Sequence, residues 1–279
     1  EPDPTCDKAF FGGDLTVLPD LLDLNTFPLD RQDSAEYGAL VRRCIADLAT
    51  TGMFNLDGFL RADIAQAEAE AHTPLMNTAS FNHARRHNVY FRKDVPGLAP
   101  DHPALVEFDT SNNTLCADQL AGSVVEQIYL WEPLQRFLAE VMGKPRLYPM
   151  EDALAAFNVM RYQEGQALNW HFDRSEFTVT LLLQAPESGG EFEYRTDLRT
   201  ADNPNYDGVA RLLAGQDPAK QSMSVVPGTL NVFRGVNTPH RVTPVQGTRA
   251  RMIAVLTYYE RPGSKFTETE QLGFYGRTA

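Results

Sequence analysis

Residues 169–184 read NWHFDRSEFTVTLLLQ, and this stretch decides how the rest of the chain is interpreted. From Phe177 onward it is rich in β-branched and apolar residues, which predicts a strand. His171 and Asp173 precede that strand, two positions apart, and in an extended chain residues i and i+2 point the same way. Both side chains could therefore reach one metal ion, while Phe172 points the other way, toward packing. Taken alone, such a pair is more often part of a surface loop, so other parts of the chain must support the site.

The second half of the chain contains more segments of this kind. Turn residues separate them, at 187–190, 227–228 and 246–247. Many short strands with regular turns predict a sandwich or barrel. A polar insert, 195–221, interrupts the series and includes one expected helical turn at YDGVARLLAG. The expected strands are AAFNVMRY, FTVTLLLQ, GEFEY, SMSVV, TLNVF, HRVTP and RMIAVLTYY.

The first half is mainly helical by its apolar spacing. Ser34 can cap a helix that ends before Gly52. Further helical segments are RADIAQAEAEA, ADQLAGSVVEQIYL and WEPLQRFLAEVMG, whereas residues 77–115 are rich in Asn, Asp, His and Pro and are expected to be irregular and lid-like. We therefore predict a single α+β catalytic unit, 1–279. A helical part, 1–150, packs against a β core, 151–279.

Composition excludes several classes of function. A formal net charge of −12 argues against a protein that binds nucleic acid. No apolar run approaches the length of a membrane span. The start, EPDPTCDKAFFGG, lacks the basic and apolar regions of a signal peptide, and the three scattered cysteines fit buried small side chains in a reduced compartment. We expect a cytoplasmic protein that acts on a small molecule.

A second histidine supports the metal site. His240 lies 67 positions after Asp173, in NTPHRVTP, at the head of another expected strand. Two histidines and one carboxylate form the facial triad of non-haem Fe(II) oxygenases, which leaves coordination positions open. The same set also binds zinc, so a zinc hydrolase on a cupin-like barrel is an alternative. His83 and His87 lack a carboxylate partner and are not interpreted as a second metal site.

Arg251 discriminates between these alternatives. It begins RMIAVLTYY, and a guanidinium buried in a barrel is costly unless it meets an anion. Its planar group can hold a carboxylate through two hydrogen bonds. An enzyme that binds 2-oxoglutarate needs such a residue, and a hydrolase does not. Arg249 has the same parity and is the second candidate.

The order of these motifs resembles the Fe(II)/2-oxoglutarate-dependent oxygenases. RYQEGQALNWHFD resembles the lead-in to the metal motif of the prolyl-4-hydroxylase-like branch. More narrowly, HFDRSEFTVTLLLQAPESGGEFEY, PGTLNVFRG, HRVTPV and FYGR resemble the BesD-like group of amino-acid halogenases and hydroxylases. The resemblance covers roughly residues 80–279. It implies a double-stranded β-helix, or jelly-roll, core that carries Fe(II) and uses 2-oxoglutarate and O2 as cosubstrates.

The resemblance also gives Asp173 its meaning. Halogenases of this type have Gly or Ala at that position, which lets a halide bind the iron. An aspartate there implies a dioxygenase that hydroxylates an unactivated C–H bond of a free amino acid or similar small polar metabolite, forming succinate from 2-oxoglutarate. Desaturation, cyclisation or halogenation by the same hydrogen-abstraction chemistry are alternatives. A non-catalytic binding module is another, and it predicts that His171, Asp173 and His240 do not converge.

Other site residues are weaker candidates, and ordinary structural roles compete for each. Asn158, Tyr162 and Thr180 could contact 2-oxoglutarate beside Arg251. One of Arg85, Arg86 and Arg92 is expected to meet a substrate carboxylate. Arg174 could do the same, or could pair with Glu176 at the surface. The full set of substrate-binding candidates is Arg174, Arg86, Thr257 and Tyr275, the last closing the site from the C-terminus.

Overall fold

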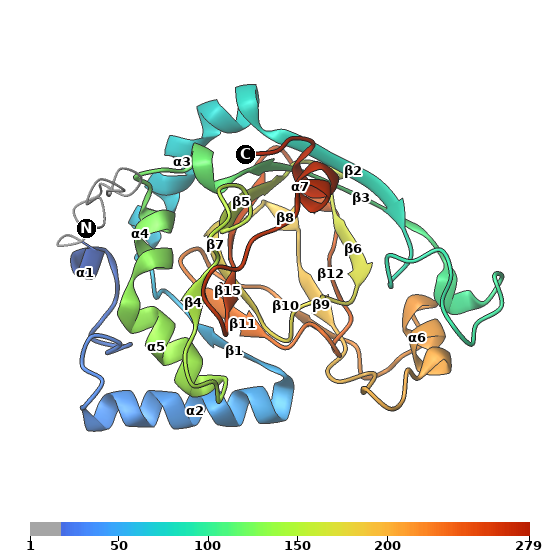
Figure 1. Ribbon diagram of the computed structural model, residues 1–279, viewed down its shortest axis with the longest axis horizontal. Helices are drawn as coiled ribbons and strands as arrows, with labels where there is room; N and C mark the ends of the chain where they lie inside the picture. Colours follow the sequence, from blue (N-terminus) through green and yellow to red (C-terminus); the bar gives the residue numbers. More distant parts are fainter. Residues whose placement is uncertain (1–17) are drawn as a thin grey trace, which may run out of the picture.

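The computed structural model describes residues 18–279, and an antiparallel sheet of seven strands forms its centre (Figure 1). Every neighbouring pair in this sheet is antiparallel. Its order is β1 (Met53–Leu56), β11 (Leu230–Phe233), β7 (Thr178–Gln184), β14 (Arg251–Leu256), β5 (Phe157–Tyr162), β3 (Phe108–Leu115) and β2 (Phe81–His87).

A four-stranded sheet packs against one face of the large sheet. Phe233 of the large sheet lies with its ring centroid 5.0 Å from that of Phe192 and 4.7 Å from that of His240, both in the smaller sheet. The two sheets form the jelly-roll core that was expected. The smaller sheet runs β10 (Gln221–Met223), β9 (Phe192–Tyr194), β12 (His240–Val242) and β6 (Leu168–His171). Two-stranded pairs are β8 (Ser188–Gly189) with β13 (Val245–Gln246), and β4 (Tyr148–Pro149) with β15 (Tyr258–Tyr259).

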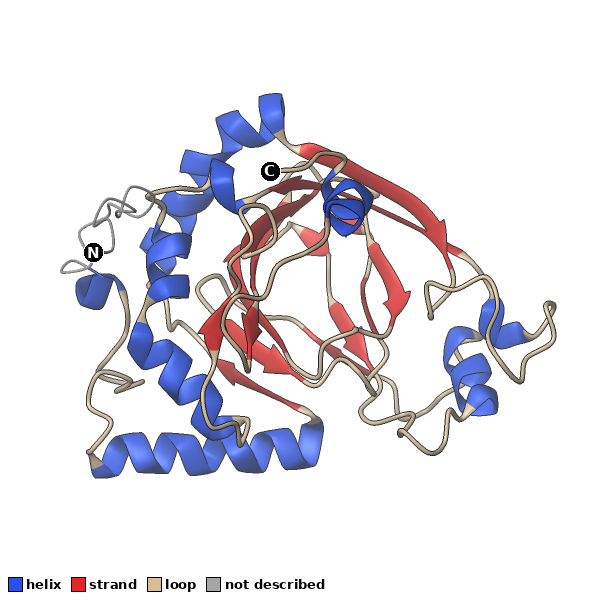
Figure 2. Cartoon of the chain, viewed as in Figure 1, coloured by secondary structure: helices blue, strands red, loops and turns tan. Residues whose placement is uncertain are grey.

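Helices cover the other face of the large sheet (Figure 2). Alternation along each strand sends one set of side chains to this face, including Val159, Leu181 and Ala254, which join the main hydrophobic core. Burying one large apolar side chain contributes about 1.5–3 kcal/mol, so each of these residues stabilises the packing of the helices on the sheet. The helices on this side are α1 (Leu18–Leu21), α2 (Ala35–Thr51), α3 (Ala62–Ala79), α4 (Val124–Leu130) and α5 (Glu132–Val141). Elsewhere lie α6 (Tyr206–Leu213), α7 (Glu268–Tyr275) and the 3-10 turns η1 (Pro103–Leu105) and η2 (Ala117–Gln119).

Helix ends follow the local sequence. Ser34 Oγ accepts a hydrogen bond from the Tyr37 N–H, and Gly52 ends α2 with φ of 77°, as predicted. The segment 117–130, predicted as one helix, is divided into η2 and α4 because Gly122 adopts a φ of 80° between them. In the polar insert, α6 is longer than the single expected turn.

The prediction of an irregular segment at 77–115 was wrong. β2 and β3 form a long hairpin arm that extends the large sheet, and only the stretch between them is irregular apart from η1. Both strands are polar because one of their faces is turned toward the candidate site, so the apolar alternation that marks a strand is missing. The strand β1 also comes from the first half of the chain.

Cys44 and Cys116 are buried free thiols, as expected for small core side chains. Cys6 and the stretch interpreted at the N-terminus lie outside the described residues. Within residues 18–279, no helix has the length and apolar character that crossing a membrane requires.

Candidate active site

His171, Asp173 and His240 converge at the end of the four-stranded sheet. Each offers one ligand atom, and these atoms all lie within 4.8 Å of one another. Asp173 Oδ1 is 3.4 Å from His171 Nε2 and 3.5 Å from His240 Nε2. Both histidines are buried and the aspartate is partly buried. This convergence contradicts the binding-module alternative.

Strand pairing brings the histidines together. His171 on β6 is the direct partner of His240 on β12, and their ring centroids are 4.2 Å apart. His171 Nδ1 lies 2.8 Å from the Asn169 carbonyl, and His240 Nδ1 lies 2.9 Å from the Thr238 carbonyl. A carbonyl only accepts, so each Nδ1 carries the proton and each Nε2 keeps a lone pair for a metal. Phe172 turns away and packs in a separate apolar cluster, as the i, i+2 argument required.

The Asp173 carboxylate is held in place by two residues that the sequence interpretation did not single out. Thr178 donates a hydrogen bond from Oγ1 to Asp173 Oδ2 at 2.6 Å. The Asp173 N–H donates to the Gly235 carbonyl at 3.1 Å, and a Cβ atom at Gly235 would collide with Oδ2. The signals that could have found them are a hydroxyl residue at the start of the next strand and the glycine that follows TLNVFR.

The protonation states suit metal binding. Burial lowers the pKa of His240 to about 4, despite the opposing effect of Asp173. Burial alone would raise the pKa of Asp173, but His240, His171 and the Thr178 hydroxyl outweigh it and hold that pKa below its usual range. Neutral imidazoles and an ionised carboxylate are the forms that bind a metal.

Arg251 lies on the interior face of the large sheet and is 4% exposed. Its guanidinium is 5.8 Å from the Tyr162 ring centroid, and its Cδ runs past Gly190. Among residues 18–279 it has neither a hydrogen-bond acceptor nor a carboxylate partner, and burial lowers its pKa. A buried, unpartnered guanidinium of this kind requires an anionic ligand. Arg249, the second candidate, is exposed in the preceding loop.

The three weaker cosubstrate candidates share this interior face. Tyr162 is the partner of Arg251 across β5 and β14, and Thr180 and Asn158 flank Val255 on neighbouring strands. The Tyr162 hydroxyl contacts the Met160 sulfur at 3.7 Å. The Thr180 hydroxyl has no hydrogen-bond partner within 18–279, whereas Asn158 is engaged by Leu154 and Tyr275. Tyr162 therefore lies beside Arg251, whereas Thr180 and Asn158 lie further along the same face, beside Val255.

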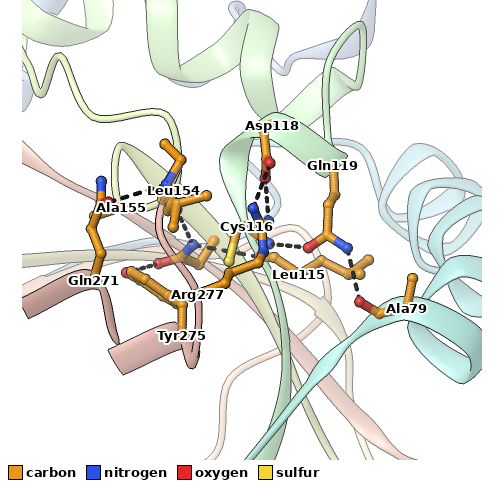
Figure 3. A network of polar contacts seen from close by, with 12 residues as sticks. Ala79, Leu115, Cys116, Asp118, Gln119, Leu154, Ala155, Gln271, Tyr275 and Arg277 are labelled. Carbon is orange, nitrogen blue, oxygen red and sulfur yellow. Dashed lines mark hydrogen bonds and ion pairs between the residues drawn. The ribbon is translucent and has the colours of Figure 1, made fainter. Parts of the chain in front are cut away.

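The C-terminal helix closes one end of the interior face. Tyr275 is buried and donates a hydrogen bond from its hydroxyl to Asn158 Oδ1 at 2.9 Å. Figure 3 shows Arg277 directed at Asp118, with two hydrogen bonds of 2.9 and 2.7 Å. Gln119 in the same network reaches the Ala79 carbonyl.

Thr257, another substrate-binding candidate, is half-buried. Its carbonyl accepts a hydrogen bond from the Tyr129 hydroxyl, and its N–H donates to the Ala156 carbonyl.

Arg85 and Arg86 are adjacent on β2, so their side chains point to opposite faces of the sheet. Arg86 points away from His83, Arg85 and His87 on β2, and forms exposed ion pairs with Glu107 and Asp109. The structure therefore does not bring Arg86 to the metal cluster, and Arg85 takes that side.

Arg174 is exposed. It lies 3.8 Å from Glu270 and over the Phe274 ring. Glu176, the alternative surface partner considered for Arg174, pairs with Lys144 instead.

Comparison with known families identifies the chain. The family model described as halogenase D matches residues 39–271, which is most of the sequence. The chain belongs to the halogenase D family. A search of curated proteins returned no match for this member of the halogenase D family.

Among solved structures, the chain is similar to AviO1 from Streptomyces viridochromogenes, with a TM-score of 0.53, 16% identity, and coverage of 80% of this chain and 96% of that one. It is also similar to the non-haem α-ketoglutarate-dependent carbocyclase SnoK, with a TM-score of 0.52, 13% identity, and coverage of 85% of this chain and 92% of that one. The epimerase SnoN has a TM-score of 0.51 and 13% identity, with coverage of 79% of this chain and 83% of that one. At these identities the likeness shows a shared fold.

Family and geometry agree on the cofactors. The halogenase D protein described here is an enzyme of the 2-oxoglutarate/Fe(II)-dependent oxygenase superfamily, as the resemblance implied. Two imidazoles, each with its Nε2 directed at the cluster, and one carboxylate fit Fe(II). The unpartnered Arg251 fits the distal carboxylate of 2-oxoglutarate. The zinc-hydrolase alternative gives no reason for that buried arginine.

Proposed function

We propose that this protein hydroxylates an unactivated C–H bond of a free amino acid or a similar small polar metabolite, while 2-oxoglutarate is converted to succinate. The observation that carries the proposal is the Asp173 carboxylate, which is fixed by Thr178 and accommodated by Gly235. Halogenases that this sequence resembles have Gly or Ala there. A carboxylate in that position occupies the site that a halide would take.

The residues of the chain have defined tasks in this proposal. His171, Asp173 and His240 would hold Fe(II) on one face, leaving the opposite positions for cosubstrates. Arg251 would bind the far carboxylate of 2-oxoglutarate, with Tyr162 and Thr180 beside it. When bound, the iron and 2-oxoglutarate supply, with O2, an oxidant able to remove hydrogen from carbon. Asn158 and Tyr275, joined by a hydrogen bond, would help to exclude water at the C-terminal end.

The test is a product analysis in the presence of halide. Wild-type protein is given Fe(II), 2-oxoglutarate, O2 and a panel of amino acids, with and without chloride or bromide. We expect succinate and a product that gains one oxygen atom, unchanged by halide. A halogenated product from wild-type protein would overturn the proposal, and a product that has lost two hydrogens would replace hydroxylation by desaturation or ring closure. The Asp173→Gly variant is the companion, since it opens the position that the carboxylate fills.

A further inference from the structure

The hairpin arm of β2 and β3 joins the two sheets. From Asn113 to Leu115, β3 pairs with β5 of the large sheet. Nearer the tip of the arm, the Ser111 N–H donates to the Ala167 carbonyl at 3.0 Å, just before β6 begins at Leu168. From this point β3 runs along β6 of the smaller sheet (Figure 1). The arm therefore contacts the strand that carries a metal ligand.

The arm holds the metal-binding segment at two points, one on each side of His171. The Asn169 N–H donates to Thr110 Oγ1 at 2.9 Å, and the Phe172 N–H donates to the Val89 carbonyl at 3.2 Å. In a regular antiparallel ladder a backbone carbonyl would accept the first of these bonds. The Thr110 side chain takes the place of that carbonyl, so the hold on Asn169 depends on the identity of one residue.

His87 sets the direction of the Thr110 hydroxyl. His87 Nδ1 lies 2.9 Å from the Asn88 carbonyl, which only accepts, so Nδ1 carries the proton. Burial lowers the pKa of His87, so the ring has no second proton at neutral pH. Nε2, at 2.7 Å from Thr110 Oγ1, therefore accepts the hydroxyl proton, and a lone pair of Oγ1 is left for the Asn169 N–H. Both His87 and Thr110 are buried.

Phe91 links His87 to the metal ligand by packing as well. Its ring stacks on His87 with the centroids 4.2 Å apart, and its centroid lies 5.7 Å from that of His171. Phe91 has a φ of 52°, in the left-handed region that a bulky residue seldom adopts. Such a conformation persists where the surroundings enforce it. Here it places one aromatic ring against both imidazoles.

We propose that Thr110 and His87 are positioning residues that orient His171 for iron. A metal-binding imidazole is aimed by the acceptor on its other nitrogen, which for His171 is the Asn169 carbonyl. Asn169 is in turn held by Thr110, whose hydroxyl is directed by His87. The arm is therefore part of the metal site and not only a cover over it. This inference concerns metal binding and goes beyond the proposed hydroxylation.

The experiment compares Thr110→Val with Thr114→Val. Thr114 lies on the same face of β3 and is also buried, but its hydroxyl donates to Asn112 of its own strand at 2.8 Å. Anaerobic titration gives the Fe(II) affinity, and NMR of the apoprotein with labelled histidine gives the His171 Nδ1–H resonance. Thr110→Val should weaken Fe(II) binding by about 10-fold, as for loss of an outer partner of a metal ligand, and should shift that resonance. Thr114→Val should leave both at wild type, with a similar loss of Tm.

Two further variants separate the hydrogen bond from general packing. Thr110→Ser keeps the hydroxyl and should restore the Fe(II) affinity and the His171 resonance, even where Tm stays below wild type. His87→Phe keeps a ring that can stack on Phe91 and removes the acceptor of the Thr110 hydroxyl. It should weaken Fe(II) binding, but less than Thr110→Val does.

Three outcomes would overturn the inference. Thr110→Val could bind Fe(II) as tightly as wild type, the two valine variants could weaken binding equally, or Thr110→Ser could fail to restore it. The second result would mean that the arm stabilises the site only as a whole. None of these measurements uses a substrate, so their failure leaves the hydroxylase proposal standing, and a failure to hydroxylate amino acids leaves this inference standing.

Discussion

The polar side chains on the two facing sheets differ in whether the chain itself supplies their hydrogen-bonding partners. At the end of the four-stranded sheet, the chain itself satisfies the outer atoms of the metal ligands: a carbonyl bonds each histidine, and the Thr178 hydroxyl, from β7 of the seven-stranded sheet, bonds Asp173. On the interior face of the seven-stranded sheet, the buried Arg251 has no anionic partner among the described residues. The metal ligands are therefore positioned by the chain itself, whereas the guanidinium of Arg251 still needs an anion. The predictions below test that difference.

Removing a metal ligand should have the largest effect. In His240→Ala, the remaining pair cannot supply a facial triad, so iron content after anaerobic loading and succinate release should both fall to background. His102→Ala is the matched control, because His102 caps η1 and is not one of the converging ligands. Full iron binding by His240→Ala would mean that the three converging residues are not the iron site.

Truncating Arg251 should affect the cosubstrate and leave the metal in place. Removing one side of a buried charge pair costs about 3 kcal/mol, so Arg251→Ala should weaken 2-oxoglutarate binding by roughly 100-fold. Iron content should stay at the wild-type level. The exposed Arg249→Ala is the control with the same charge change. Equal affinities in the two variants would mean that the large sheet does not bind the cosubstrate through Arg251.

Local sequence predicted the β core well because strands such as FTVTLLLQ and RMIAVLTYY are buried on both faces and rich in apolar residues. The same rule failed for β2 and β3. His83, Arg85 and His87 share one face and Arg86 the other, so neither face is apolar and periodicity gives no signal. Only their pairing within the sheet reveals them as strands.

The candidate site also contains residues that local sequence could predict and residues that only the tertiary structure reveals. His171 and Asp173 could be paired from strand parity, because that geometry is local. Arg85 could not be separated from Arg86, because the choice depends on the register of β2 against β3. Thr178 and Gly235 were missed since their importance lies in one contact each with Asp173, which local sequence does not encode.

Thr178 offers a finer test of the metal site. Thr178→Val removes the hydroxyl that orients Asp173 and keeps the β-branched shape. Loss of an outer partner of a metal ligand weakens metal affinity or activity by about 10- to 100-fold. Iron titration of the variant should show this weakening, with thermal stability near wild type. Thr180→Val, on the same strand, is the control and should leave iron affinity unchanged.

Asp152 is a buried carboxylate that, like Asp173, accepts hydrogen bonds from its own chain, but it is not one of the converging metal ligands. Replacing it tests whether such a carboxylate contributes only to stability. It accepts from the N–H groups of Leu154, Ala155 and Phe266 and from Gln271 of α7. Burial opposes ionisation, but these donors outweigh it and lower the pKa of Asp152. Asp152→Ala should cost about 3 kcal/mol at neutral pH, on the order of 5–10 °C in Tm, without changing iron affinity.

The pH dependence of Asp152 has a definite sign. A group whose folded-state pKa is lowered stabilises the protein above its unfolded pKa, about 3.9 for aspartate, and loses that contribution as pH falls toward the folded value. The Tm difference between wild type and Asp152→Ala should therefore be full at neutral pH and shrink below about pH 4. A difference that stays constant through this range would mean that the side chain acts through packing and not through its charge. Altered iron affinity at neutral pH would mean that the C-terminal helix and the metal site are coupled.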